Sequence, residues 1–261
     1  VARDGRVLRE IAHAAPSYRV TVVAWGAPGD VPSDVALRPV TPAALTARDR
    51  ILQAALLAGG RWRAPLFDRW YWRKPDHHEA LAHVVAARPA LIHANEAIAL
   101  PVAVRAAAAT GARVLFDAHE YSPDQFKDHR LLRVLAAPLY RHLVGRYGPR
   151  ADAMVTVAPT IAERYRREFG LDCAVVLNAP PYQRVPFRPV DPARIRLIHH
   201  GVALRGRHLE TTIDALARCD RRFSLDLMLV ESSRGYVDEL RALARRVAPD
   251  RGTFRVPVAP G

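Results

Sequence analysis

Apolar runs of strand length recur along this chain, and each is followed by a stretch with a helical pattern. In the first part of the chain, the expected strands are residues 19–25, 90–93, 113–116, 153–157 and 174–177, and the expected helices are residues 76–87, 97–110, 131–147 and 160–169. Gly111 and Gly170 follow two of these helices, as glycine commonly does, and Thr160 is expected to cap the last one. Because helices connect parallel strands, the alternation predicts an α/β fold with helices on both faces of a parallel sheet.

A proline-rich stretch interrupts this alternation between residues 178 and 192. Its five prolines fix the backbone and remove hydrogen-bond donors, which predicts an extended linker. The alternation then restarts, with expected strands at residues 195–199, 225–230 and 253–256 and expected helices at residues 209–218 and 236–247. We therefore expect two Rossmann-like domains, at residues 1–185 and 194–261. A doubly wound sheet usually has about five or six strands, so the three in the second domain predict that it is incomplete.

Residues 41–76 fit neither pattern, because aromatic residues alternate there with arginines. The aromatic residues are Trp62, Phe67, Trp70, Tyr71 and Trp72. One interpretation is a helical excursion packed on the first domain. The other is a surface that contacts an acceptor or a membrane, since Trp and Arg side chains suit the boundary of lipid headgroups. The sequence leaves both interpretations open.

The formal net charge of +13 admits three kinds of partner: nucleic acid, anionic lipid headgroups, or the phosphates of a small substrate. Only two of the 39 basic residues are lysine, and the arginines are spread over every segment. A nucleic-acid-binding protein would gather them on one element, so we expect no nucleic-acid partner. No long apolar stretch is free of charge and no signal-peptide pattern opens the sequence, which favours a cytoplasmic protein.

Polar side chains follow three of the expected strands of the first domain. Asn95 and Glu96 come after the second strand, and Asp117, His119 and Glu120 come after the third. Asn178 follows the last strand in the same way. Because parallel sheets bind ligands beyond the carboxyl ends of their strands, these residues are the first candidates for a site.

Two further motifs flank these strand ends. Residues 4–10 have the pattern Asp-x-Arg-Val-x-Arg-Glu, and Gly201, Arg205 and Arg207 follow the first strand of the second domain. In this order, the motifs resemble those of retaining GT-B glycosyltransferases of family four, over nearly the whole chain. The resemblance implies a GT-B fold and the transfer of a sugar, with retention, from a nucleoside-diphosphate sugar to a glycan or lipid-linked acceptor. Compared with that family, the sequence is expected to be truncated at both ends.

The resemblance also implies roles for single residues. His119 corresponds to a histidine that contacts the donor sugar, and Arg207 corresponds to a basic residue that binds the donor diphosphate beside the glycine-rich turn at Gly201. Val202 stands where the family has another arginine, so Arg205 is a candidate to replace it. Arginine suits this position because negative charge grows on the diphosphate as the glycosidic bond breaks.

The remaining strand-end residues are candidates for a sugar or acceptor cleft. They are Asn95, Glu96, Asp117, Glu120 and Asn178. Each candidate also has a purely structural interpretation. Asp117 would then cap the turn that follows it, a backbone group would satisfy His119, and Arg207 would be an exposed arginine at the start of a helix.

The sequence offers no persuasive metal or cofactor motif. Its eleven histidines lack the spacing of a metal site, and neither a Gly-x-Gly-x-x-Gly turn after a strand nor a Walker-type loop occurs. We expect no metal and no cofactor, with the nucleotide sugar as co-substrate. Glu231 and Glu239 have the spacing of the family's C-terminal glutamate pair, but they follow the wrong strand and are not assigned to the site.

Two other functions stay open. A nucleotide-sugar epimerase can have the same fold, but it needs a carboxylate base near the sugar C2. A non-catalytic module would hold an acceptor or a membrane and transfer nothing. An anionic membrane surface at the inner face of the cell membrane is a further candidate partner, and the resemblance associates the chain with cell-envelope polysaccharide.

Overall fold

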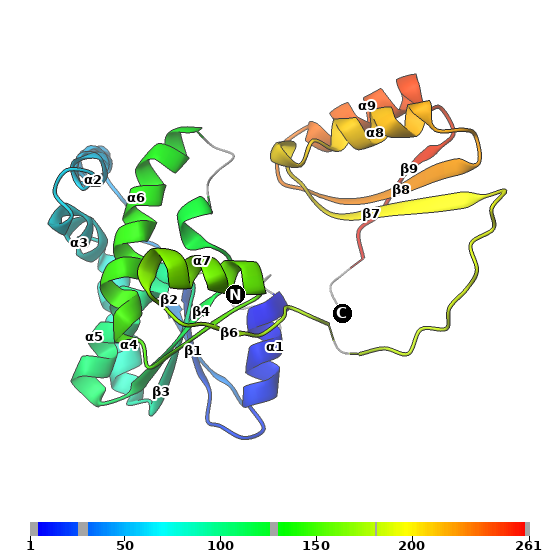
Figure 1. The fold of residues 1–261 in the computed structure, drawn as a ribbon. Helices are drawn as coiled ribbons and strands as arrows, with labels where there is room; N and C mark the ends of the chain where they lie inside the picture. The colour runs from blue at the N-terminus through cyan, green and yellow to red at the C-terminus, as the bar shows by residue number, and fades with distance from the viewer. Residues whose placement is uncertain (1–4, 26–30, 126–129, 181, 259–261) are drawn as a thin grey trace. The chain divides into compact units, whose positions relative to one another are not determined.

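Figure 1 shows a computed structural model of the chain, which describes residues 5–25, 31–125, 130–180 and 182–258. The chain divides into two compact units, Val1–Pro180 and Pro181–Gly261. Asp4 and Pro181, which belong to patterns discussed above, lie outside the described residues. None of the helices in the described ranges is long and apolar enough to cross a membrane.

The first unit contains two parallel sheets. One pairs β1 (Thr21–Trp25) with β2 (Ala36–Val40). The other has its strands in chain order: β3 (Leu91–Asn95), β4 (Arg113–Ala118), β5 (Ala153–Thr156) and β6 (Ala174–Val175). Strand β2 was not expected, because Pro39 lies inside it and its side chains do not alternate between apolar and polar.

Helices cover these strands. They are α1 (Gly5–Ala14), α2 (Ala47–Gly59), α3 (Pro65–Trp72), α4 (Pro75–Ala87), α5 (Leu100–Thr110), α6 (Arg130–Tyr147) and α7 (Pro159–Phe169), with short 3-10 turns at Ala97–Ala99, Ser122–Asp124 and Gly148–Arg150. Figure 1 shows α1 and α5 on opposite sides of the strands β3 and β4. The predicted parallel α/β architecture is therefore confirmed for this unit.

The helix ends test the expected capping residues. Gly111 and Gly170 end α5 and α7 with positive φ angles of 77° and 67°, as predicted, because glycine has no Cβ to oppose that conformation. The prediction for Thr160 is wrong. Helix α7 begins at Pro159, and Ala158 occupies the cap position without a side-chain hydrogen bond. Proline suits the first helical position, since its φ is already set and its missing N–H would have no helical partner there.

Residues 41–76 form a helical excursion, as one of the two interpretations expected. Phe67 and Tyr71 of α3 are buried, and Trp70 and Trp72 pack against the same core. The Tyr71 hydroxyl donates to the Ile98 carbonyl at 2.6 Å, which ties α3 to the turn after β3. Most of the aromatic residues thus belong to the core.

The second unit has one parallel sheet with two helices. Its elements are β7 (Ile195–Ala203), α8 (Leu209–Arg218), β8 (Phe223–Glu231), α9 (Tyr236–Val247) and β9 (Gly252–Arg255), with a 3-10 turn at Arg205–Arg207. The strands lie in the order β7–β8–β9, and both helices cover the same face (Figure 1). Leu225, Leu227 and Leu229 alternate along β8 and point into a core with these helices. This unit therefore also has the predicted class.

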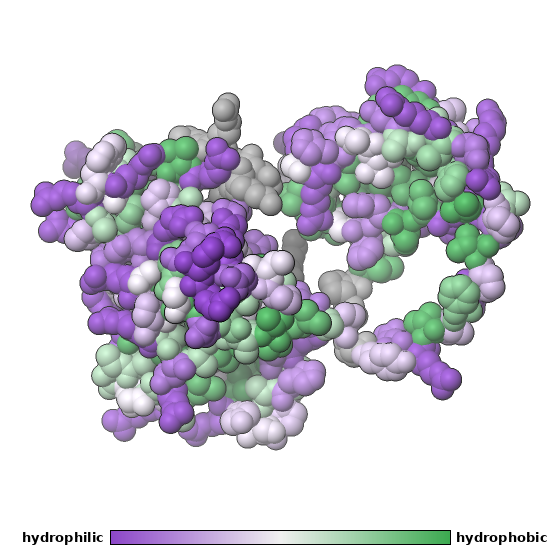
Figure 2. All heavy atoms as spheres, in the orientation of Figure 1, coloured by the Kyte–Doolittle hydropathy of each residue, from purple (hydrophilic) through white to green (hydrophobic). Residues whose placement is uncertain are grey.

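The segment before β7 has neither helix nor strand over residues 182–190. Its apolar side chains are exposed, as Figure 2 shows by their hydrophobic colouring along the chain before β7. Tyr182 and Phe187 are 91% and 89% exposed. This agrees with the extended conformation that the prolines predict.

Candidate functional site

Asp117 is a charged residue among the apolar residues of strand β4. It lies near the end of β4, between the buried residues Phe116 and Ala118, and is itself 0% exposed. A buried carboxylate is costly unless hydrogen bonds and opposite charges compensate it. The partners of Asp117 therefore define the centre of the candidate site.

Arg6 of helix α1 supplies the main compensation. Its Nε lies 3.1 Å from Asp117 Oδ2, and its Nη2 lies 3.0 Å from Oδ1 and 2.9 Å from Oδ2. Its Nη1 donates to the Val176 carbonyl at 3.1 Å, just after β6. The guanidinium is also buried, and its planar fork matches both carboxylate oxygens. Helix α1 is thereby fixed to the carboxyl ends of β4 and β6.

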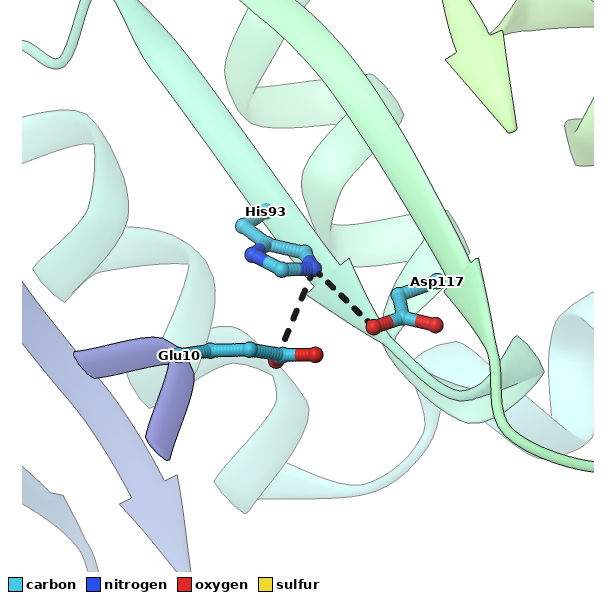
Figure 3. Close-up of side chains that lie close together, drawn as sticks. All are labelled: Glu10, His93 and Asp117. Carbon is cyan, nitrogen blue, oxygen red and sulfur yellow. Dashed lines mark ion pairs between the residues drawn. The ribbon is translucent and has the colours of Figure 1, made fainter. Parts of the chain in front are cut away.

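Glu10 lies one helical turn after Arg6 and faces the same carboxylate (Figure 3). Its Oε1 lies 2.9 Å from Arg6 Nε. Burial, followed by a hydrogen bond with Asp117 and the charge of that residue, raises the pKa of Glu10 to about 7, although His93 and Arg6 act in the opposite direction. Near neutral pH, a protonated Glu10 can donate its O–H to Asp117.

Asp117 itself stays ionised. Burial alone would raise the pKa of its carboxyl, but hydrogen bonds from His119, His93 and Glu10 outweigh burial and hold this pKa well below its usual value. Of the two acids, Asp117 is therefore the acceptor and Glu10 the proton carrier. Such a division is expected when two carboxyl groups share one site.

His93 of β3 completes the cluster that Figure 3 draws. Its Nε2 lies 3.4 Å from Asp117 Oδ2 and 3.9 Å from Glu10 Oε2. Ligand atoms of these three residues lie within 4.8 Å of one another, close enough to hold a metal ion. However, Arg6 already contacts both oxygens of Asp117 and one of Glu10, and a cation would be repelled by this guanidinium. The chemistry of the cluster favours a shared proton over a metal.

His119 is a further neighbour of the Asp117 carboxylate. Its Nε2 is 3.4 Å from Asp117 Oδ2, and its Nδ1 is 3.5 Å from Glu96 Oε1. The side chain is 12% exposed, so a small part of the ring reaches the surface. Each ring nitrogen thus faces a carboxylate oxygen. The neighbours of this imidazole are Asp117 and Glu96, and not Glu120, which follows it in the sequence.

Glu96 has an unusual backbone. Its φ of 69° is rarely adopted by residues other than glycine, and its N–H donates to the Asp117 carbonyl at 2.9 Å. This hydrogen bond joins the ends of β3 and β4 and turns the Glu96 side chain toward His119. Beside it, the Oδ1 of Asn95 is buried and has no hydrogen-bond partner in the described part of the chain.

Glu120 and Asn178 occupy different surroundings. The side chain of Glu120 is exposed, and its carbonyl accepts a hydrogen bond of 2.9 Å from the Tyr165 hydroxyl. The same hydroxyl accepts from the Ser122 N–H at 3.0 Å, so the buried Tyr165 holds the loop after β4. The side-chain oxygen of Asn178 accepts a short hydrogen bond from Arg9 of α1. The structure therefore brings Asp117, His119 and Glu96 together and leaves Glu120 facing solvent.

The second unit positions Gly201, Arg205 and Arg207 around the end of β7. Gly201 has a φ of 135°, and a Cβ there would lie 3.2 Å from Arg207 Nη1. Glycine therefore permits both this backbone and the close approach of the guanidinium. Arg207 Nη1 also lies 3.5 Å from the Val202 carbonyl.

Arg205 has closer partners than Arg207. Its Nη2 lies 2.7 Å from Glu239 Oε1, and its guanidinium lies 4.5 Å from the centre of the Tyr236 ring. Both charged side chains are more than half exposed, so solvent weakens the ion pair. Of the two arginines, Arg207 is the one beside the glycine, and Arg205 is bound to α9.

Comparison with known proteins decides the family. The model of Glycosyltransferase Family 4 matches residues 5–179, which is most of the first unit and more than half of the chain. The chain belongs to this family. No curated protein matches the sequence.

Several solved structures resemble this family member. HepE from Anabaena, in complex with UDP, has a TM-score of 0.61 and 17% identity, over 98% of this chain and 66% of HepE. The sucrose-phosphate synthase of Thermosynechococcus elongatus has a TM-score of 0.61 and 16% identity, over 95% of this chain and 63% of the synthase. The lipopolysaccharide outer core galactosyltransferase WaaB has a TM-score of 0.58 and 13% identity, over 99% of this chain and 66% of WaaB.

At these identities, the likeness establishes the fold. The GT-B class with two parallel-sheet units, which the sequence predicted, is confirmed. The family member spans about two thirds of the length of HepE and WaaB. His119 lies in the first unit and Arg207 in the second, and their cooperation stays a prediction.

Sequence reasoning did not assign Arg6, Glu10 and His93 to the site. Arg6 and Glu10 were visible as parts of the motif of residues 4–10, and their spacing of four places them on one helix face. His93 alternates with the buried Ile92 and Ala94 and therefore faces the same side as Asp117. No signal in the sequence indicates that Arg6 contacts Asp117, because the two residues are 111 positions apart.

Proposed function

We propose that this member of Glycosyltransferase Family 4 transfers a sugar from a nucleoside-diphosphate sugar to an acceptor, with retention of configuration and without a metal or other cofactor. The observation that supports this most is the network around Asp117, which holds His119 at the carboxyl ends of β3 and β4. In parallel sheets, that edge is where ligands bind. The family match supports the reaction class.

In this proposal, His119 contacts the donor sugar and Arg207 binds the diphosphate. An imidazole held between Asp117 and Glu96 can hydrogen-bond a sugar hydroxyl through a small movement of the ring. Arg207 meets the negative charge that grows on the leaving diphosphate, with Arg205 as a second cation if it leaves Glu239. Solved structures of HepE contain UDP and UDP-glucose, so uridine diphosphate sugars are the first donors to test.

The first unit would bind the acceptor, a glycan or a lipid-linked sugar of the cell envelope. Asn95 and Glu96 stand at the end of β3 and Asn178 follows β6, at the same edge of the sheet as Asp117, and the side-chain oxygen of Asn95 offers an acceptor for a sugar hydroxyl. Glu120 adds an exposed carboxylate in the loop after β4, at the same edge of the sheet. Sugar hydroxyls suit such a set, because each can donate and accept.

We also propose that an anionic membrane at the inner face of the cell membrane is a partner, through helix α2. Arg48, Ile51, Leu52 and Ala55 are all exposed and recur at the spacing of one helix face. Gln53 is buried instead and Leu57 packs against the core, whereas the apolar side chains of Ile51 and Leu52 face outward. Arginine beside exposed apolar groups is the chemistry that binds anionic headgroups.

The turn after α2 has the same character. Trp62 is 82% exposed, although the other aromatic residues of this region pack inward, and Arg61 and Arg63 flank it. Within the described ranges, Arg48 and Arg63 form no ion pair. Vesicles of phosphatidylglycerol should therefore bind the protein, and vesicles of phosphatidylcholine alone should not. Binding that is equal on both would remove the membrane from the proposal.

The transfer reaction is tested by incubating the protein with UDP-sugars, with and without an acceptor extract, and following UDP release. We expect release that persists in EDTA, an anomeric configuration that NMR shows to be retained, and a loss of about a hundredfold in kcat for His119→Ala. The assay should use both this chain and the product of the complete coding region. An epimerised free sugar nucleotide would indicate an epimerase, and donor binding without turnover by either protein would indicate a binding module.

A further inference from the structure

Asp117 connects helix α1 with His119. Its carboxylate accepts from Arg6, a carboxyl oxygen of Glu10 lies within 4.8 Å of it, and its Oδ2 also faces His119 Nε2 at 3.4 Å. We propose that Arg6 and Glu10 are positioning residues, which orient the His119 imidazole by fixing Asp117. The expected change in kcat rests on the proposed function, whereas the expected change in the orientation of His119 does not.

Arg6 fixes the plane of the Asp117 carboxylate. Contacts to both carboxylate oxygens prevent the group from rotating about its last bond, because rotation would break at least one of them. Arg6 is held in turn by the Val176 carbonyl at 3.1 Å and by Glu10 at 2.9 Å. Lysine would keep the positive charge but not the two parallel contacts.

Glu10 contributes a hydrogen bond. When protonated, it can donate to the neighbouring Asp117, and its Oε2 lies 3.9 Å from His93 Nε2, which is itself 3.4 Å from Asp117 Oδ2. Glutamine can replace this function, because its amide also donates. Alanine cannot.

The other contact of His119 depends on the same residue. Glu96 faces His119 Nδ1, and the Glu96 N–H is bound to the Asp117 carbonyl at 2.9 Å. Both carboxylates around the ring are thus arranged by Asp117, one through its side chain and one through its main chain. A shift of Asp117 would disturb both sides of the imidazole together.

The alternative is that Arg6 merely anchors α1 to the sheet. The two possibilities differ in what happens at His119, which an anchor would leave unchanged in a folded variant. The ring nitrogens of His119 can be followed by NMR of histidine-labelled protein, with His119→Gln to assign the signals. This measurement does not need a donor, an acceptor or turnover.

The test compares Arg6→Lys, Glu10→Ala and Glu10→Gln. Arg6→Lys and Glu10→Ala are expected to change the His119 ring signals and to lower kcat about tenfold, with the KM for the donor within about twofold of wild type. Glu10→Gln is expected to retain both the signals and kcat. If Arg6→Lys does not fold, the two Glu10 variants still decide the question.

Arg146→Lys is the matched control. Arg146 pairs with Asp68 at 3.2 Å, between α6 and α3, and should leave His119 unaffected. His119 signals in Arg6→Lys and Glu10→Ala that match this control would overturn the inference, as would a Glu10→Gln protein that behaves like Glu10→Ala. Changed signals in a protein that transfers no sugar from any donor would support the positioning role and refute the proposed function.

Discussion

Charged candidate residues stand at the ends of β4 and β7, but they are buried in the first unit and exposed in the second. At β4, Asp117 and Arg6 are buried and bound to each other through several contacts. At β7, Arg205 and Arg207 are exposed, and the partner of Arg205 is an exposed glutamate. The first unit thus satisfies its own charges, whereas the second presents cations that a ligand can use. Buried pairs fix geometry, and exposed arginines provide affinity.

The largest expected effect comes from breaking the buried pair. Arg6→Met leaves Asp117 buried without its main partner, and should lower the free energy of unfolding by about 3–5 kcal/mol. Urea unfolding measures this change. In the double variant Arg6→Met with Asp117→Asn, no uncompensated charge remains, and most of the loss should be recovered. A double variant that is no more stable than Arg6→Met would show that the pair is not the source of the stability.

The pH dependence of stability should follow Glu10. Its pKa is raised from 4.5 to about 7 in the folded protein, so the proton it binds stabilises the fold fully below about pH 4.5. This contribution is lost as the pH rises through about 7. Among the neighbours, Asp117 adds to the rise in the Glu10 pKa, whereas His93 and Arg6 oppose it. The free energy of unfolding of wild type should therefore fall between about pH 5 and 8, as urea titrations at several pH values would show.

Glu10→Gln is the control for that titration, since its amide donates at every pH. Its stability should be nearly constant over the same range. Asp117 has the opposite sign: its pKa is lowered, so it stabilises the fold above its ordinary value of 3.8 and ceases to do so as the pH falls below it. A wild-type protein whose stability rises from pH 5 to 8 would contradict the assignment of the proton to Glu10.

In the second unit, the effect should appear in ligand binding. Arg207→Ala is expected to weaken UDP binding about tenfold in calorimetry, because an exposed guanidinium beside Gly201 is available to the diphosphate. Its thermal unfolding should remain close to that of wild type. An unchanged affinity for UDP would separate Arg207 from the donor site, and Arg205→Ala then becomes the informative variant.

The smallest effect is expected for the exposed pair of Arg205 and Glu239. Removing either side chain should hardly change the thermal unfolding of the protein, since solvent screens the interaction. Differential scanning calorimetry of Glu239→Ala checks this. A large destabilisation would mean that the exposed pair near β7 stabilises the fold in the same way as the buried pair at β4.

Much of the fold could be predicted from local pattern. Glycine at positions 111 and 170 marked the helix ends, because the conformation required there suits glycine whatever lies around it. Thr160 was misassigned because Pro159 competes for the same helix start. Strand β2 escaped prediction because pairing with β1, not its own residues, makes Ala36–Val40 a strand.

The candidate site divides in the same way. That polar residues such as Asp117 and His119 stand at strand ends follows from the order of residues alone, since alternation and strand length are matters of local periodicity. The contact of Arg6 with Asp117, and of Glu96 instead of Glu120 with His119, became visible in the folded chain. Such partners depend on how α1 packs on the sheet and how the backbone turns at Glu96, and periodicity carries no information about contacts between distant segments.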